Sequence, residues 1–206
     1  LMIIDAGLAI CEYPHPCLRR ACVPVREVDD DIRLLAARMF ELMYEHKGCG
    51  LAAPQVGVPL RMFVVNPSGD PARKDLEAVY INPEYVKTFG TVHAPEGCLS
   101  LLPLSTAEIP IPRHTMIEIA ATGLDGVRFV ASCSMRDVGY RSRLCQATQH
   151  ELDHLQGVLY VDHAPPAAKA WVAGMLGYME EQFRWKVEKA GKSPPMAELE
   201  GAMEAF

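Results

Sequence analysis

"TQHELDHLQGVLYVD", residues 148–162, places two histidines and a glutamate within five residues of one another. His150 and His154 are four positions apart, so on a helix both imidazoles lie on one face, where a single metal ion can bind them. Glu151 points roughly 100° away around such a helix and can approach a water molecule on the ion without being a ligand. The alternative is an ordinary solvated helix face. We predict a central helix over residues 142–155 that carries a metal centre.

The periodicity of the remaining chain predicts an α+β fold. Apolar residues at helical spacing predict an N-terminal helix over 31–47, with acidic residues at its positive end. A C-terminal helix is predicted over 165–191, and we expect its apolar stripe to pack onto the sheet rather than bind a partner. Between the helices lie short β-rich runs with an Asp-Gly hairpin signal at 125–126. The predicted strands of this mostly antiparallel sheet are 61–65, 79–81, 116–120 and 128–133.

Length and composition indicate one compact domain over 1–206. We place its core at about 10–162 and a loosely ordered tail at 192–206. A net charge of −6 and no basic run with interleaved aromatics argue against a direct nucleic-acid partner. The seven cysteines form no CxxC pair, which suits a reducing intracellular compartment. No apolar run approaches the ~18 residues of a membrane span. We therefore expect a soluble intracellular protein, and the first residue, a leucine, suggests either that a presequence was removed or that the start was trimmed in preparation.

A catalytic centre of this type needs a third protein ligand. The extended pattern HExxHxxGxxH fails here because a tyrosine stands where the third histidine belongs, and His163 comes three residues too late. Glu180 and Glu181 remain candidates, but charged residues on the C-terminal helix more often face solvent. Cys98, within PEGCLS, offers a soft thiolate ligand. From these residues alone, Cys98 could equally be a buried structural cysteine.

The stretch GCGLAAPQVG, residues 48–57, follows the N-terminal helix. It is either a tight turn into a strand or a loop that presents backbone N–H groups and the Gln55 amide to a substrate carbonyl. Together with EGCLS and QHELDHLQG, this stretch resembles the three signature motifs of the peptide deformylase family, in the family's order. YPHPCLRRACVPV, residues 13–25, is also similar to the start of that family. The resemblance covers about 10–162.

The resemblance implies a metallo-hydrolase that removes the formyl group from the N-terminal formylmethionine of nascent polypeptides and releases formate. It implies one divalent ion, Fe2+ in cells and Zn2+, Ni2+ or Co2+ in some preparations, bound by Cys98, His150 and His154. Glu151 would act as general base and then acid on a water bound to the ion. Gln55 and the backbone N–H of Leu99 would stabilise the oxyanion. The expected compartment is the bacterial cytoplasm or, in a eukaryote, the mitochondrial or plastid matrix.

The resemblance also implies where the substrate binds. Backbone at Cys49 and Gly50 would pair with the peptide as an added strand. Arg113 most resembles the family's arginine near the substrate site. The methionine pocket would be walled by His150 and by aliphatic residues near 144–147.

Three departures from the family pattern concern this same region. The loop 101–113 lacks glycine and is about three residues longer, His114 replaces a common aromatic, and Gln146 replaces a common basic residue. The competing functions are a metalloprotease and a catalytically weak relative that binds nascent chains or ribosomes. The presence of Cys98, Glu151 and Gln55 argues for the active enzyme.

Overall fold

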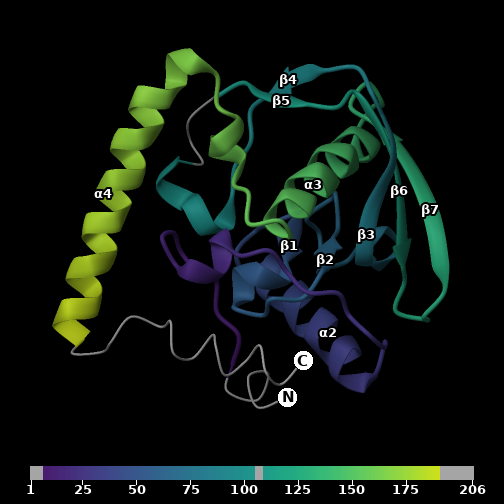
Figure 1. The fold of residues 1–206 in the computed structure, drawn as a ribbon. Helices are drawn as coiled ribbons and strands as arrows, with labels where there is room; N and C mark the ends of the chain where they lie inside the picture. Colours follow the sequence, from purple (N-terminus) through teal and green to yellow (C-terminus); the bar gives the residue numbers. More distant parts are fainter. Residues whose placement is uncertain (1–6, 105–108, 191–206) are drawn as a thin grey trace.

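The computed structural model describes residues 7–104 and 109–190 and has an α+β architecture, as the sequence predicted (Figure 1). A five-stranded antiparallel sheet has the order β1-β2-β3-β6-β7, and β4 and β5 form a separate pair. The strands are β1 (Gly50–Ala52), β2 (Met62–Val65), β3 (Ala78–Phe89), β4 (Val92–Ala94), β5 (Ile111–Arg113), β6 (Met116–Thr122) and β7 (Arg128–Ser134). The α-helices are α2 (Asp30–Glu45), α3 (Tyr140–His154) and α4 (Pro166–Ala190). The short 3-10 helices are η1 (Pro16–Arg19), η2 (Ala53–Val56), η3 (Lys74–Leu76), η4 (Leu99–Leu104) and η5 (Tyr160–His163).

Strand β2 lies between two helices and is buried on both of its faces. Alternate residues of a strand point to opposite faces, so Met62 and Val64 join the core beneath α2, while Phe63 and Val65 join the core beneath α3. Figure 1 shows α3 in the middle of the molecule, against the sheet. This arrangement puts the HExxH turn of α3 in the protein interior.

The strand predictions were correct in place but incomplete. The run 79–81 is only the beginning of β3, because Asn82 adopts a positive φ of 50° and the register with β6 shifts between Ile81 and Glu84. These irregularities interrupt the alternation on which a sequence prediction rests. Strands β1, β4 and β5 have three residues each, too few to show a period. The Asp-Gly hairpin between β6 and β7 is confirmed.

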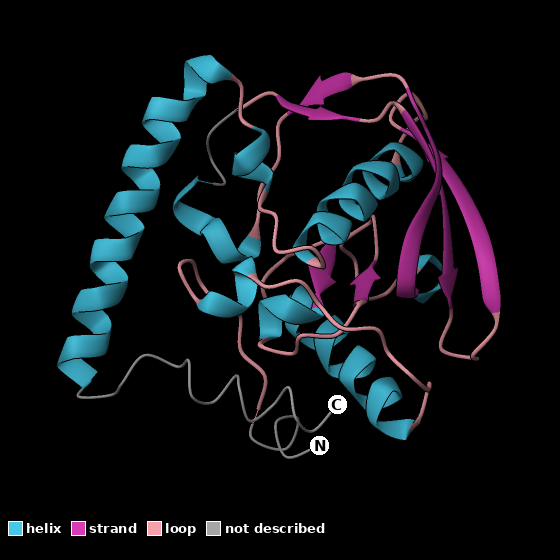
Figure 2. Cartoon of the chain, in the orientation of Figure 1, coloured by secondary structure: helices cyan, strands magenta, loops and turns pink. Residues whose placement is uncertain are grey.

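Helix α4 does not pack on the sheet, so the packing expected of its apolar stripe was wrong. Its buried residues Val172 and Met179 instead contact a second core cluster that contains Leu101 and Tyr160. Figure 2 shows α4 on the opposite side of the molecule from the long strands. The physical reason is that α3 already covers the inner face of the sheet. Within the described ranges no helix is both long and apolar enough to cross a membrane, and the tail 192–206 lies outside them.

Candidate metal centre and active-site cavity

The structure brings Cys98 together with His150 and His154, although 56 residues separate Cys98 from His154. All three side chains are buried, and their ligand atoms lie within 4.8 Å of one another. Cys98 Sγ is 3.3 Å from His154 Nε2. An ion with metal–sulfur bonds of about 2.3 Å and metal–nitrogen bonds of about 2.0–2.1 Å holds such atoms roughly 3.5 Å apart. The donor set therefore fits one divalent ion, and three protein ligands leave one position for water.

Backbone geometry at the end of α3 fixes this centre in the fold. His150 and His154 are one helical turn apart, and their ring centroids are 4.9 Å apart. The chain then reverses at Gly157, which has a φ of 72°. A Cβ at this position would lie 2.6 Å from the carbonyl carbon of Arg19, so only glycine allows this close approach.

Behind His150 lies a network of charged groups, centred on buried Glu96 and Arg113, that the sequence did not reveal. Glu96 accepts hydrogen bonds from Arg113 Nε at 2.6 Å, from Arg113 Nη2 at 2.8 Å and from His150 Nδ1 at 2.9 Å. Arg113 Nη1 also donates to Asp153 at 2.5 Å, and the same carboxylate accepts from His163 at 2.9 Å. Burial opposes ionisation of Glu96, but its bonds with Arg113 and His150 lower its pKa to about 2. Because Glu96 holds the Nδ1 proton of His150, the Nε2 lone pair is left for a metal ion.

Glu151 occupies the cavity side of the same helix. Its side chain is buried, and Oε2 has no hydrogen-bond partner within residues 7–104 and 109–190. Burial raises the pKa of this carboxyl group to about 7. A Cβ at Gly50 would lie 2.4 Å from Glu151 Oε1, so the glycine makes room for the carboxyl group. A buried carboxyl group with this pKa can both accept and return a proton near neutral pH.

The amide of Gln55 is oriented by the backbone. Its Oε1 accepts a hydrogen bond from the Ala52 N–H at 2.8 Å. This contact directs Nε2 towards Cys98 Sγ, 3.6 Å away, and Ser100 Oγ, 3.2 Å away. A buried amide donor thus lies beside the metal-binding group. Ser100 was not singled out from the sequence, although it belongs to the EGCLS motif.

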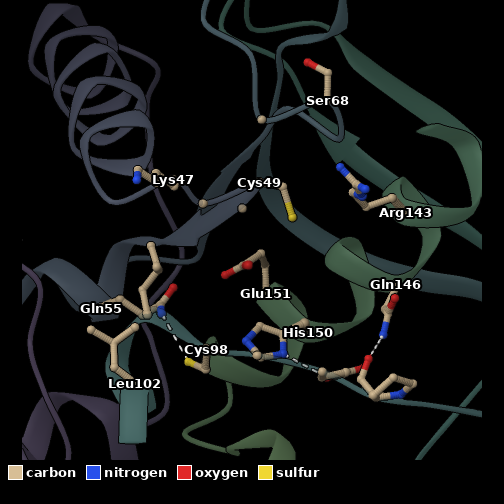
Figure 3. Close-up of a pocket in the computed structure, with 17 residues that line it drawn as sticks. Lys47, Cys49, Gln55, Ser68, Cys98, Leu102, Arg143, Gln146, His150 and Glu151 are labelled. Carbon is tan, nitrogen blue, oxygen red and sulfur yellow. Dashed lines mark hydrogen bonds and ion pairs between the residues drawn. The ribbon is translucent and has the colours of Figure 1, made fainter. Parts of the chain in front are cut away.

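Gln55, Cys98, His150 and Glu151 face one cavity of about 510 Å³, drawn in Figure 3. Cys49, Gly50 and Leu99, which were expected to contact substrate, line it together with Glu151. The lining also includes Lys47, Ser68, Pro95 and Arg143, to which the sequence did not point, and Leu102 of the unusual loop 101–113. Leu102 is the described part of the unusual loop that reaches the cavity, and residues 105–108 of that loop lie outside the described ranges.

Other expected site residues lie elsewhere. Arg113 is only 6% exposed and lies behind Glu96, a position that favours support of His150 over contact with substrate. Of the segment 144–147, Gln146 lines the cavity, and its neighbours pack into the core between α3 and the sheet. His114 instead exchanges hydrogen bonds with Gln149. Glu180, once a candidate ligand, accepts a hydrogen bond from Tyr13.

Comparison with known proteins shows relatives over most of the chain. Residues 8–170 match the polypeptide deformylase family. The chain is 35% identical over 176 residues to the peptide deformylase of Acidobacterium capsulatum, an alignment that covers 85% of this chain and 97% of the relative. It is 36% identical over 185 residues to that of Buchnera aphidicola, with 90% and 93% covered.

Solved structures agree with these sequence matches. A plant peptide deformylase of type 1B superimposes with a TM-score of 0.78 at 33% identity, covering 91% of this chain and 95% of the plant chain. A peptide deformylase from Legionella pneumophila gives a TM-score of 0.72 at 31% identity, covering 86% and 98%.

Proposed function

The chain belongs to the peptide deformylase family and is a peptide deformylase, and from this premise we propose how its residues divide the reaction. The substrate class that the family implies is the formylated peptide. Hydrolysis breaks the bond between the formyl carbon and the amine nitrogen and adds water, yielding formate and a free amino terminus. One observation carries the proposal: Glu151, whose Oε2 has no hydrogen-bond partner among the described residues, lines the same cavity as Cys98 and His150, which form a buried ligand group with His154.

We infer that the resident ion in cells is Fe2+, and that Zn2+, Ni2+ or Co2+ can occupy the same site in preparations. One thiolate and two imidazoles suit any of these ions. When bound, the ion lowers the pKa of water towards neutrality and polarises a carbonyl oxygen. Cys98, as the thiolate, and the two neutral imidazoles would hold it, with His150 oriented by Glu96.

Glu151 is the proposed general base and acid. Its carboxylate takes a proton from the attacking water, holds it on a carboxyl oxygen, and gives it to the departing amine nitrogen. The group needs a pKa near the working pH to serve in both directions. Burial without a neutralising partner on Oε2 supplies that condition.

Gln55 and Leu99 are the proposed oxyanion donors. The formyl oxygen gains negative charge as the water adds, and donors held in advance stabilise it most strongly. The Gln55 Nε2 is fixed by the hydrogen bond between Oε1 and the Ala52 N–H. Leu99 follows the ligand Cys98 directly in the chain and lines the same cavity, so its backbone N–H lies close to the reacting group.

The edge of the sheet is the proposed peptide-binding surface. Strand β1 is the edge strand of the five-stranded sheet, and its first residue, Gly50, lines the cavity. An extended peptide can join such an edge through main-chain hydrogen bonds, which tolerates many sequences. The apolar side chains of Leu99 and Leu102 line the same space and suit a methionine side chain. N-formylmethionyl nascent peptides fit both features. The alternative, a silent relative that binds nascent chains or ribosomes, gives no reason to keep Glu151 and Gln55 in place.

The test is formate release from formyl-Met-Ala-Ser by protein prepared without oxygen and loaded with Fe2+, because ferrous iron and Cys98 are both sensitive to oxidation. We expect turnover that a chelator abolishes and that added Fe2+ restores. Acetyl-Met-Ala-Ser is the matched substrate control and should release no acetate at a comparable rate. A fully metal-loaded protein that binds the formyl peptide without releasing formate would support the silent relative instead.

A further inference from the structure

A second group of metal-ligand side chains lies in the N-terminal segment. The ligand atoms of Cys11, His15 and Cys17 lie within 4.8 Å of one another. Cys17 is buried, and the other two side chains are half-buried. His15 Nδ1 is 2.7 Å from Cys17 Sγ. All three come from seven consecutive residues, and none belongs to the catalytic cavity described above.

The backbone of neighbouring elements holds these side chains in place. His15 is the N-cap of η1, and its Nδ1 accepts the Cys17 N–H at 3.4 Å. The ring nitrogen that faces the sulfur therefore carries a lone pair rather than a proton. At the other end of the segment, the backbone N–H of Cys11 donates to the backbone carbonyl of Gln55 at 2.7 Å. The cluster is thus preorganised by contacts outside its own side chains.

We propose that Cys11, His15 and Cys17 form a second metal site that binds Zn2+. As each sulfur–zinc bond forms, the thiol gives its proton to solvent, so two thiolates and a neutral imidazole balance the charge of the ion. Tetrahedral zinc requires ligand atoms roughly 3.5 Å apart, so the His15–Cys17 contact opens by under an ångström. The partly exposed Cys11 and His15 leave the fourth position to water.

The position of the cluster gives the site a structural role. Cys11 is bonded to the Gln55 carbonyl, and the Tyr13 N–H donates to the Ser100 carbonyl at 2.9 Å. An ion held by Cys11, His15 and Cys17 would therefore fix the segment whose backbone N–H groups donate to Gln55 and Ser100. Because the ion binds the folded chain, it would raise the melting temperature in proportion to the logarithm of free Zn2+.

The experiment counts Zn2+ bound per chain after dialysis of the full-length, reduced protein against buffered Zn2+. All seven cysteines are first verified as free thiols. Because the described residues contain two ligand groups, we expect two Zn2+ per wild-type chain, one for Cys11→Ser/Cys17→Ser and one for Cys98→Ser. Cys22→Ala, a nearby buried cysteine outside both groups, is the matched control and should keep two. Raising free Zn2+ until the second site fills should increase the melting temperature of wild type. The same rise in Zn2+ should leave the melting temperature of Cys11→Ser/Cys17→Ser unchanged.

A further variant protects the test against misfolding. His15→Gln keeps both thiols, and removal of a ligand should weaken the second site by more than the ~10-fold typical of losing an outer-shell partner. Three results would overturn the proposal. They are a single Zn2+ in reduced wild type, a second Zn2+ that persists in a folded double variant, and unchanged affinity in His15→Gln.

Discussion

The two sides of His150 differ in how completely their polar groups are paired. On the support side, Glu96 uses both carboxylate oxygens for Arg113 and His150, and its pKa falls to about 2. On the cavity side, Glu151 has an oxygen without a partner in the described chain, and its pKa rises to about 7. One buried carboxyl group is therefore fixed as a carboxylate, whereas the other is poised to exchange a proton.

The difference matches the separate tasks that we propose for these two carboxyl groups. Orientation of a metal ligand requires a partner with a constant charge, and a guanidinium beside Glu96 provides it. Proton transfer requires the opposite, a group whose two protonation states are close in free energy. Substitutions on the cavity side should therefore slow the reaction, and those on the support side should weaken the fold or metal binding.

The largest expected effect is that of Glu151→Gln on turnover. The amide keeps the shape of the side chain but cannot take a proton from water. General acid–base catalysis contributes about 10²–10⁴-fold, so kcat for formate release should fall by that factor. Glu181→Gln, an exposed glutamate on α4, is the control and should leave kcat unchanged. An active Glu151→Gln enzyme would show that the base is another group.

Among the variants on the support side, Arg113→Met should lower the free energy of unfolding the most. It removes the guanidinium from buried Glu96 and from half-buried Asp153, which keeps only His163. Loss of one partner of a buried ion pair costs about 3–5 kcal/mol in the free energy of unfolding. Urea denaturation of the metal-free protein measures this value. Arg128→Met, an arginine whose side chain is 63% exposed, should stay within about 0.5 kcal/mol of wild type. Equal stability of the two variants would mean that the network is not structural.

Gln55→Ala tests the cavity side again. Loss of one oxyanion donor lowers kcat by about 10²–10³-fold. Gln146→Ala is the matched control, because Gln146 lines the same cavity but donates to the Pro95 carbonyl at 2.7 Å. Its kcat should remain close to wild type. If the two glutamine variants lose the same activity, the assignment of Gln55 as a specific donor fails.

Glu96→Gln should act mainly on metal affinity. The amide weakens the hold on His150 Nδ1, and loss of such an outer-shell partner raises the metal dissociation constant by about 10–100-fold. Competition with a chromogenic chelator gives the constant. Glu84→Gln, on an exposed part of β3, serves as the control. Unchanged affinity in Glu96→Gln would separate the network from the metal centre.

The smallest effect concerns His163 at the edge of the network. Its hydrogen bond to Asp153 raises the pKa of the imidazole above its usual 6.5. The stability that charged His163 contributes is therefore complete below about pH 6.5 and is lost as the pH rises through the folded-state pKa. Because the side chain is 36% exposed, the difference between wild type and His163→Gln should be only about 0.2–1 kcal/mol at pH 6. Denaturation at pH 6 and pH 9 should show this difference shrinking, and growth with pH would contradict the assignment.

The sequence predicted the residues on the cavity side of His150 more completely than those on its support side. The spacing of His150 and His154 is local, so helix geometry alone placed them on one face. The part played by Cys98 came from a family resemblance, because no local pattern connects residues 56 positions apart. Glu96 and Arg113 were not recognised as partners for the same reason: their contact depends on the pairing of β4 with β5.

The fold shows the same division between local and long-range information. Helix α3 and the strands of the hairpin were predicted from period and turn chemistry. The surface that α4 covers was not predicted. A stripe of apolar residues indicates that a helix packs against something, but it does not indicate against what. Gly50 is similar: only the structure shows that its missing side chain makes room for Glu151.

The most direct test measures bound metal and formate release on the same samples of Glu151→Gln and Glu96→Gln at saturating and limiting Fe2+. We expect Glu151→Gln to retain the ion at both concentrations and to lose turnover at both. We expect Glu96→Gln to lose the ion at limiting Fe2+ and to recover most of its turnover at saturation. If Glu151→Gln instead loses metal, or Glu96→Gln stays inactive when fully loaded, the division between a reactive side and a supporting side of His150 is contradicted.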